Sequence, residues 1–245
     1  MKRFYRFIAI LAWIGLLIII FVSFGDRKNS FEPGSGLNSP QNLNNFPKIT
    51  APEAKVYSID KNKSELIVRL YKKGIFSGFA HNHIVIAREF SGSVEFDEVD
   101  PAQFKIAIEV PANSITADLP EIRRKYGLEV LSQKDWIDIN KTMRSSRQLN
   151  IEKYPIVKFS SGSLKRIQGK QFEITGEFSL HGITKLIAVP VKISVENGIL
   201  KLQGEFSFLQ SDYNITPFSG ALGTVRNKDE ALLKFDISAP NKNEK

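Results

Sequence analysis

Three histidines are the residues of this chain best suited to chemistry, because an imidazole ring exchanges protons and binds metal ions near neutral pH. His81 and His83 lie two residues apart. In a strand this spacing places both rings on one face, which suits two ligands of a zinc ion. Further ligands would have to come from His181, Asp97 or Glu95. Two other roles stay open for the pair: hydrogen bonding within the fold, or contact with the polar end of a ligand.

Other catalytic chemistry finds little support in the sequence. The chain has no cysteine, which excludes thiol catalysis, disulfides, cysteine-bound zinc and iron–sulfur clusters. It also contains no G-x-S-x-G nucleophile elbow, no phosphate-binding P-loop, no G-x-G-x-x-G and no H-E-x-x-H. His181 precedes Gly182 at the end of an alternating segment, where we expect its ring N–H to fix a turn. We therefore predict that the protein is not an enzyme.

The first residues predict export. Lys2, Arg3 and Arg6 precede an uncharged apolar run over residues 7–24. At about 1.5 Å per residue this run spans roughly 27 Å, enough to cross a bilayer core and longer than an ordinary signal-peptide core. Residues 1–25 are predicted to be a signal anchor, with a signal peptide cleaved after Gly25 as the alternative. Either form exports the rest of the chain.

The remaining chain divides by composition. Residues 26–54 are rich in Asn, Pro, Ser and Gly and show no periodicity, which predicts a flexible linker. Residues 55–240 alternate apolar and polar side chains, as half-buried strands do, and form the predicted folded domain. Residues 241–245 are predicted to be a disordered tail. Asn197-Gly198, between two alternating segments, predicts a tight hairpin.

Several strands are expected to share one apolar inner face, and one segment interrupts them. The inward residues are predicted to be Leu66, Val68 and Leu70; Phe104, Ile106, Ile108 and Val110; Phe172, Ile174, Phe178 and Leu180; Leu200, Leu202, Phe206 and Phe208; and Leu233, Phe235 and Ile237. Residues 120–149 instead predict one or two helices, the second capped by Ser132. Many one-face-apolar strands with few helices predict an all-β fold, either a closed antiparallel barrel or a sandwich.

Several strings along the folded region resemble one known family. These are residues 57–64 (YSIDKNKS), residues 90–97 (FSGSVEFD), residues 151–161 (IEKYPIVKFSS) and residues 174–185 (ITGEFSLHGITK). Their order over residues 56–239 is similar to that of the YceI-like family. The resemblance implies an extended, lipocalin-like antiparallel β-barrel that holds a polyisoprenoid or another long apolar ligand. It also implies export to the periplasm or cell envelope. Together with the predicted signal anchor of residues 1–25, this predicts a protein anchored in the inner membrane.

One segment resembles a sub-branch of that family. Residues 74–83 (GIFSGFAHNH) are similar to a GLFSxFAHxH-type string, with two histidines where the family commonly has one. We therefore predict ligand contacts from Phe76 and Phe79, and from His81 and His83 at the polar end of the ligand. Phe178, Phe206 and Phe208 are the predicted contacts on the strands. Residues 211–217 lack the Arg-Ser/Asp-Phe-Gly pattern common elsewhere in the family.

The sequence thus predicts an exported protein that carries a long apolar, isoprenoid-type lipid and needs no other cofactor. The formal charge of +8 permits contact with acidic membranes or nucleic acid. Nucleic acid is not an expected partner, because few aromatic residues lie among the basic ones. Two alternatives remain: a metal-binding protein or a metal-dependent or acid/base enzyme using His81 and His83, and a solidly packed envelope protein. A cavity of at least about 300 Å³ would argue against solid packing. The oligomeric state, including a homodimer, stays open.

Overall fold

The computed structural model describes residues 54–74, 81–220 and 225–242. These residues belong to a compact unit that spans Ile49–Lys245. The predicted anchor, the linker, Phe76 and Phe79 lie outside the described residues. Among the helices that the structure describes, none combines the length and the apolar character that crossing a bilayer requires.

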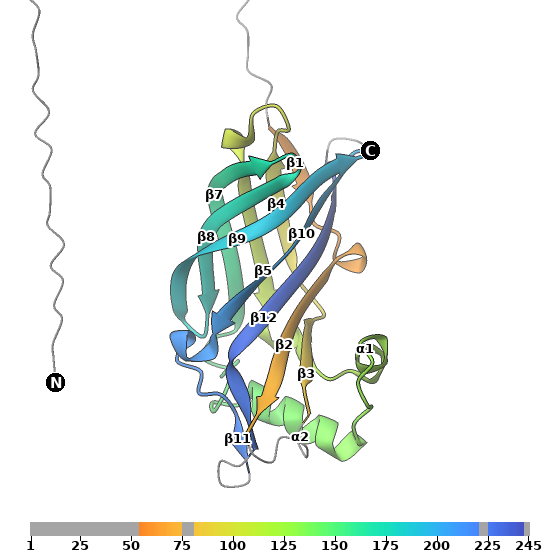
Figure 1. Ribbon diagram of the computed structural model, residues 1–245, viewed down its shortest axis with the longest axis vertical. Helices are drawn as coiled ribbons and strands as arrows, with labels where there is room; N and C mark the ends of the chain where they lie inside the picture. The colour runs from red at the N-terminus through yellow and green to blue at the C-terminus, as the bar shows by residue number, and fades with distance from the viewer. Residues whose placement is uncertain (1–53, 75–80, 221–224, 243–245) are drawn as a thin grey trace, which may run out of the picture. The chain divides into compact units, whose positions relative to one another are not determined.

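The described chain is mostly strand (Figure 1). The strands are β1 (Lys55–Ser58), β2 (Glu65–Lys73), β3 (His83–Ala87), β4 (Ser91–Phe96), β5 (Lys105–Pro111), β6 (Ile115–Ala117), β7 (Ile156–Gln168), β8 (Gln171–Leu180), β9 (Ile183–Glu196), β10 (Ile199–Leu209), β11 (Ser219–Gly220) and β12 (Val225–Pro240). The helices are α1 (Pro120–Lys125) and α2 (Gln133–Arg144), with short 3-10 turns that include η4 (Ala112–Ser114) and η5 (Gln210–Tyr213).

The predicted alternation and the predicted hairpin are both confirmed. Phe172, Ile174, Phe178 and Leu180 of β8 are all buried, whereas Glu177 between them is exposed. Asn197 and Gly198 join β9 to β10 with φ angles of 51° and 72°. Positive φ at both positions defines the type I′ turn, whose twist matches that of the flanking strands. This turn sets the register of the whole β9–β10 pair, beginning with Glu196 opposite Ile199.

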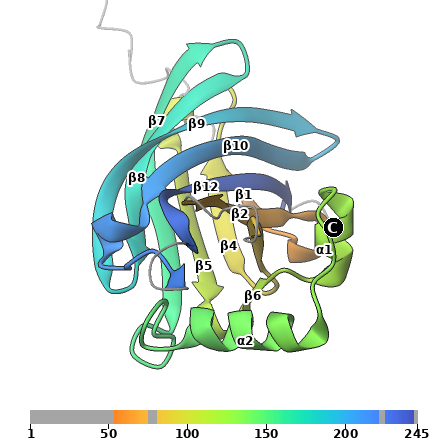
Figure 2. The same ribbon diagram turned by 60° about the horizontal axis from the view of Figure 1, so that its bottom comes forward.

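All strand pairs are antiparallel, and the sheet curls back on itself (Figure 2). The order is β1-β4-β5-β7-β8-β9-β10-β12-β2-β3-β6, with β11 beside β12. The edge strand β6 follows β5 in the chain after the short turn η4. Because β5 is an inner strand of the sheet, this short connection holds the edge strand close to an inner one. The other edge closes through a bridge between Tyr57 and Asn241 and a hydrogen bond of 2.9 Å from Asp60 N to the carbonyl of Ser238. The lipocalin-like, all-β prediction is therefore confirmed, and ordered chain continues past Pro240 into the predicted tail.

The interior has two differently packed regions. Beside β1 and the end of β12, the rings of Phe96, Phe104 and Phe172 pack edge-to-face and are at most 3% exposed. Toward the opposite end a second cluster forms around Phe178, Leu180, Tyr213 and Ile215, together with half-buried neighbours. Solid packing at one end stabilises the fold. It leaves the other end free to form a cavity.

The predicted helical insertion is confirmed, and its second helix covers the edge strand β6. Ser132 caps α2, because its hydroxyl accepts the N–H of Asp135 at 3.1 Å. Trp136 Nε1 and Asn140 Nδ2 donate to the carbonyl of Ala117 at 2.9 and 3.0 Å. Asn140 Oδ1 accepts the Ala117 N–H at 2.9 Å. These bonds satisfy main-chain groups that an edge strand otherwise leaves open.

The turn after β8 belongs to residues 174–185 and contacts Tyr154 of residues 151–161; both segments carry the family resemblance. His181 Nδ1 lies 2.9 Å from the carbonyl oxygen of Tyr213, as expected for a turn-fixing imidazole. Its ring also packs edge-to-face on Tyr154, at 4.4 Å between centroids. Gly182 has φ +76°, and a Cβ there would lie 2.9 Å from Cδ1 of Tyr154 and closer still to Cε1. Glycine is therefore required at this position for its conformation and for space.

Replacing Gly182 by alanine should destabilise the fold by about 2–4 kcal/mol, because a positive-φ side chain and a clash with Tyr154 add together. Gly169→Ala is the matched control. Gly169 has φ +54°, and a Cβ at this position would meet nothing within 4 Å, so only about 1 kcal/mol of backbone strain is expected. Urea unfolding followed by circular dichroism measures both. Equal losses in the two variants would contradict the packing role of Gly182.

Candidate functional site

An apolar cavity lies inside the curled sheet, and α2 contributes to its wall through Met143. Its lining includes the predicted inward residues Leu66, Val68 and Leu70 of β2, and Leu233, Phe235 and Ile237 of β12. Further walls come from β3, β5, β7, β8 and β10, and from Met143 of α2, Leu149 and Ile215. The cavity is therefore built from most of the barrel, and one end of it is formed by the helical insertion.

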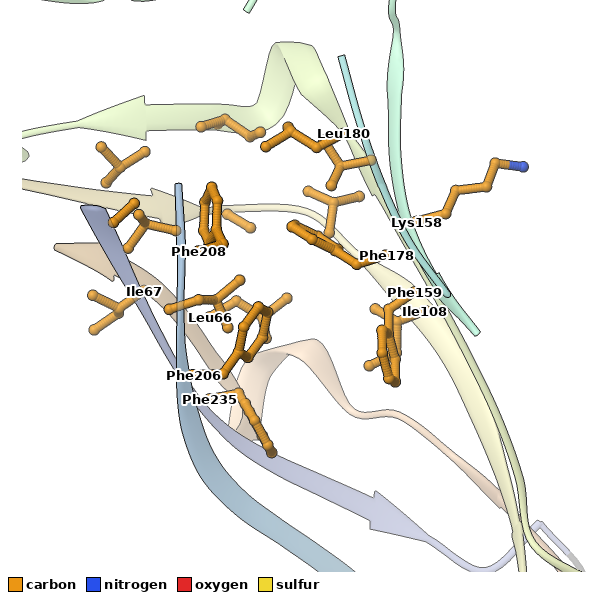
Figure 3. A pocket seen from close by; sticks show the side chains of 18 of the residues that line it. Leu66, Ile67, Ile108, Lys158, Phe159, Phe178, Leu180, Phe206, Phe208 and Phe235 are labelled. Atoms are coloured by element: carbon orange, nitrogen blue, oxygen red, sulfur yellow. The ribbon is translucent and has the colours of Figure 1, made fainter. Parts of the chain in front are cut away.

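Five phenylalanine rings dominate the wall: Phe159, Phe178, Phe206, Phe208 and Phe235. Figure 3 shows them arranged around an open space, together with Leu66 and Ile108. The Phe178 ring packs against Phe206 at 5.7 Å and Phe208 at 5.6 Å between centroids. Phe178 is 5% exposed, whereas Phe206 and Phe208 are only half-buried. Half-buried rings that face inward have apolar surface in contact with the cavity rather than with other side chains.

Two glycines on the inner face make room for rings of this wall. Gly176 lies between the inward residues Ile174 and Phe178, and a Cβ there would lie 2.7 Å from Cζ of Phe159. Gly204 holds the same place on β10, and a Cβ there would lie 2.6 Å from Cζ of Phe235. An inward glycine within an otherwise alternating strand marks such a close approach.

The polar side chains on the lining are already engaged. Lys158 points away from the cavity in Figure 3, and its Nζ lies 2.6 Å from the carboxylate of Glu109. Gln210 donates to the carbonyls of Lys228 and Asp229 at 2.9 and 3.2 Å. Gln148 donates to the carbonyl of Thr216 at 3.0 Å. The described wall thus offers a ligand apolar contact almost alone.

The cavity volume is about 210 Å³. This is below the roughly 300 Å³ that we set as the criterion against a solidly packed barrel. It exceeds the roughly 150 Å³ of an engineered apolar cavity that binds benzene. Volume alone therefore leaves the packed alternative open. The space accommodates an apolar group larger than benzene without any rearrangement.

His81 and His83 have different surroundings in the structure. β3 begins at His83, so His81 precedes the strand, and the expectation that both rings share one strand face is wrong. His81 is exposed. His83 Nδ1 lies 2.6 Å from Oδ2 of Asp118, and the His83 side chain is 16% exposed. No group of three His, Cys, Asp or Glu side chains that could hold a metal occurs within residues 54–74, 81–220 and 225–242.

His83 instead belongs to a buried polar cluster with Asp118 and Arg123 that sequence reasoning missed. Asp118 Oδ1 accepts from Arg123 Nη1 at 2.6 Å and from the Ile84 N–H at 3.1 Å. Arg123 Nη1 also donates to the carbonyl of Asn82 at 3.0 Å, and its Nε donates to that of Glu129. The Asp118 carboxylate is fully buried and the Arg123 side chain is 2% exposed. The cluster ties β3, β6 and α1 together beside the cavity end.

Electrostatics keep this buried carboxylate ionised. Burial by itself would raise the pKa of Asp118. The hydrogen bond and charge of His83, with the Ile84 N–H and Arg123, outweigh burial and hold that pKa below its ordinary value. Asp118 has φ +56°, which a carboxylate side chain tolerates better than most. Asp118 is a single aspartate before Leu119-Pro120 and belongs to no motif with a characteristic spacing. The sequence therefore offered no reason to predict its role.

The structure places the predicted ligand contacts in different surroundings. Phe178, Phe206 and Phe208 all lie on the cavity wall. His83 is in the polar cluster, His81 is exposed, and Phe76 and Phe79 lie outside the described residues. Contact with a ligand stays a prediction for all of them.

Comparison with known proteins gives a consistent family and fold. Residues 57–239 match the family described as the YceI-like domain. UPF0312 protein plu2095 of Photorhabdus laumondii is 28% identical over 146 residues, 55% of this chain and 67% of that protein. Protein YceI of Salmonella newport is 26% identical over 137 residues, 56% of this chain and 61% of that protein. The chain therefore spans about two thirds or less of the length of these curated relatives.

Two solved structures have the same fold. Burkholderia cenocepacia BcnA matches with a TM-score of 0.57 at 18% identity, covering 74% of this chain and 99% of that one. A polyisoprenoid binding domain from Saccharophagus degradans, described as implicated in plant cell wall breakdown, matches with a TM-score of 0.51 at 13% identity. That match covers 78% of this chain and 99% of the other. The predicted family resemblance is thereby confirmed.

Asp118→Asn should destabilise the protein by about 3–5 kcal/mol at neutral pH, because it leaves the buried Arg123 guanidinium without its counter-ion. A carboxylate whose pKa is depressed by folding stabilises the fold above its unfolded pKa, and this contribution is lost as the pH falls through the folded value. The gap between wild type and variant should therefore begin to narrow below about pH 4 and continue to narrow as the pH falls toward the lower folded pKa. Denaturant unfolding at pH 7 and pH 3 measures it.

Glu109→Gln is the control, since it removes an exposed carboxylate whose pairing with Lys158 is worth at most about 1 kcal/mol. A loss below 1 kcal/mol for Asp118→Asn, or a gap that persists unchanged in acid, would contradict the structural role of the cluster.

Proposed function

The chain belongs to the YceI-like domain family, and on that premise we propose that it binds a long apolar lipid of the isoprenoid type inside its curled sheet. The single observation that carries the proposal is the cavity wall. Four of the five inward phenylalanines, Phe159, Phe206, Phe208 and Phe235, are only half-buried there because they adjoin unfilled space, while Phe96, Phe104 and Phe172 at the opposite end are buried. A stably folded barrel has no need of such a surface unless something covers it.

Apolar contact is sufficient to hold a ligand of this kind. Burial of apolar area contributes about 25 cal/mol per Å² before the costs of association are subtracted. The described lining offers no unpaired charge, and its amides are engaged with main-chain carbonyls. Such a wall selects for ligands by their apolar length and width and not by a headgroup.

The ligand has to be thin or the cavity has to widen. The volume of about 210 Å³ holds a short part of a long chain. Phe206 and Phe208 are half-buried and line the cavity. A change in the side-chain rotamers of these two residues is the rearrangement that we expect on binding.

The class of lipid follows from one neighbour of the same fold. The Saccharophagus degradans structure is described as a polyisoprenoid binding domain, which makes prenyl chains the first ligands to test. As a carrier or sequestering protein, the chain would act outside the cytoplasm, held to the inner membrane by residues 1–25. Phe76 and Phe79 remain predicted contacts with the lipid, and His81 and His83 remain the predicted contacts at its polar end.

A tryptophan in the cavity should block binding. Leu233→Trp places a larger side chain among Phe206 and Val68, its neighbours across the strands. Excluding even two methylene groups of a ligand, at about 0.8 kcal/mol each, weakens binding roughly tenfold or more. Titration of the full chain with a polyprenyl phosphate that carries a fluorescent headgroup measures the affinity.

Lys234→Trp is the matched control, since the next residue along β12 is exposed on the outer face. This variant should bind as the wild type does, and circular dichroism should show that both variants are folded. If wild type takes up no prenyl lipid, or if both tryptophans weaken binding equally, the cavity is not the lipid site and the packed-barrel alternative is favoured.

A further inference from the structure

The end of the sheet nearest α2 combines basic and exposed apolar side chains. This α2 end consists of α2, the turn at residues 145–150, the segment 210–220 and the adjoining ends of β2 and β12 (Figures 1 and 2). Its parts are connected, because Gln148 donates to the carbonyl of Thr216 at 3.0 Å. The N–H of Asn227 also donates to the carbonyl of Phe218 at 2.9 Å.

Two positive charges face each other here across neighbouring strands. Arg226 of β12 pairs directly with Lys73 of β2, and both side chains are exposed. Like charges directly opposite each other destabilise a sheet. Within the described part of the chain neither side chain makes an ion pair. Lys228 adds a further exposed charge on β12, whereas the nearby Asp229 carboxylate is bound by the N–H and hydroxyl of Ser211.

Apolar side chains gather at the same end. Of eight exposed large apolar residues in the described part, Ile137 and Phe218 lie at this end, and Ile156 and Leu209 lie at strand ends next to it. Phe218 directly precedes β11, whose Ser219 pairs with Arg226. On α2, the exposed Ile137 lies between Lys134 and Lys141, next to Asp138, and Asp135 is also exposed in the first turn. Basic residues interspersed with exposed apolar ones are typical of surfaces that contact anionic lipid.

This end is also where the cavity approaches the surface of the fold. Met143, Leu149 and Ile215 of the α2 end contribute to the cavity wall. The surface at the α2 end and the cavity therefore share residues.

We propose that the α2 end is a docking surface for an anionic bilayer, with Lys73, Arg226 and Lys228 contacting lipid phosphates and Phe218 entering the interface. Docking deepens the proposed function, because the bilayer would be the source of the bound lipid. The biological purpose of docking rests on the proposed function, but docking itself does not. Vesicles without isoprenoid test docking itself, so docking and cavity binding succeed or fail separately.

The absence of cysteine allows a single environment-sensitive label. An NBD label on Phe218→Cys of the full chain reports burial at the α2 end, whatever residues 1–25 do. Val99→Cys is the matched control, because Val99 is 86% exposed and lies in the turn after β4, at the opposite end of the sheet. Vesicles of phosphatidylglycerol and phosphatidylcholine provide the anionic and neutral surfaces.

We expect the label at residue 218 to brighten and shift to the blue on phosphatidylglycerol and not on phosphatidylcholine, while the label at residue 99 stays unchanged. Each basic side chain near an anionic surface strengthens binding about fivefold. Lys73→Gln with Arg226→Gln should therefore raise the vesicle concentration at half-maximal signal by about 25-fold, and added salt should weaken docking. The same charge loss at the opposite end, Lys192→Gln with Lys201→Gln, should have little effect.

An equal response of the two labels, an equal response to neutral vesicles, or no effect of the Lys73 and Arg226 substitutions would overturn docking at this surface. A response to soluble polyglutamate with none to vesicles would also overturn it, in favour of an acidic protein partner. Normal prenyl uptake alongside any of these results would leave the cavity proposal standing.

Discussion

Closure of an antiparallel sheet around apolar side chains is the constraint on which the rest of this structure depends. Every strand must turn one face inward, and the inner faces must together either fill the interior or leave a space for something else. Edge-to-face rings around Phe96, Phe104 and Phe172 fill one end. Toward α2 the inward rings include the half-buried Phe206 and Phe208, and a cavity lies beside them. Gly176 and Gly204 let the rings of Phe159 and Phe235 lie close to neighbouring strands.

Several polar side chains in the described part of the chain support this arrangement. Asp118 joins His83 to Arg123 and so fixes α1 against the sheet, while Asn140 and Trp136 fix α2 along β6. His181 holds its turn through the carbonyl of Tyr213. The histidines that first suggested chemistry are thus, where the structure shows their contacts, part of the framework that shapes the apolar interior.

Sequence patterns predicted what depends on local periodicity and turn chemistry. The alternating strands, the Asn197-Gly198 hairpin and the Ser132 cap follow from rules that act over a few residues. The Asp118 cluster could not be predicted, because its members meet only after β3, β6 and α1 have been brought together. The two inward glycines were visible as interruptions of the alternation, but their meaning depends on rings that lie on neighbouring strands. For the same reason, the alternation of side chains placed both Phe206 and Phe104 on the inner face of the sheet. It could not distinguish a residue that lines the cavity from one that is packed in the solid core.

The central claim is that the interior is a binding surface for a long apolar chain and not only a core. Native mass spectrometry of the full chain isolated from its own cells, with no lipid added, tests this most directly. We expect a one-to-one adduct that organic extraction releases and identifies as a prenyl lipid. A protein that is always isolated empty, and whose mass does not change after incubation with prenyl lipids, would contradict the claim.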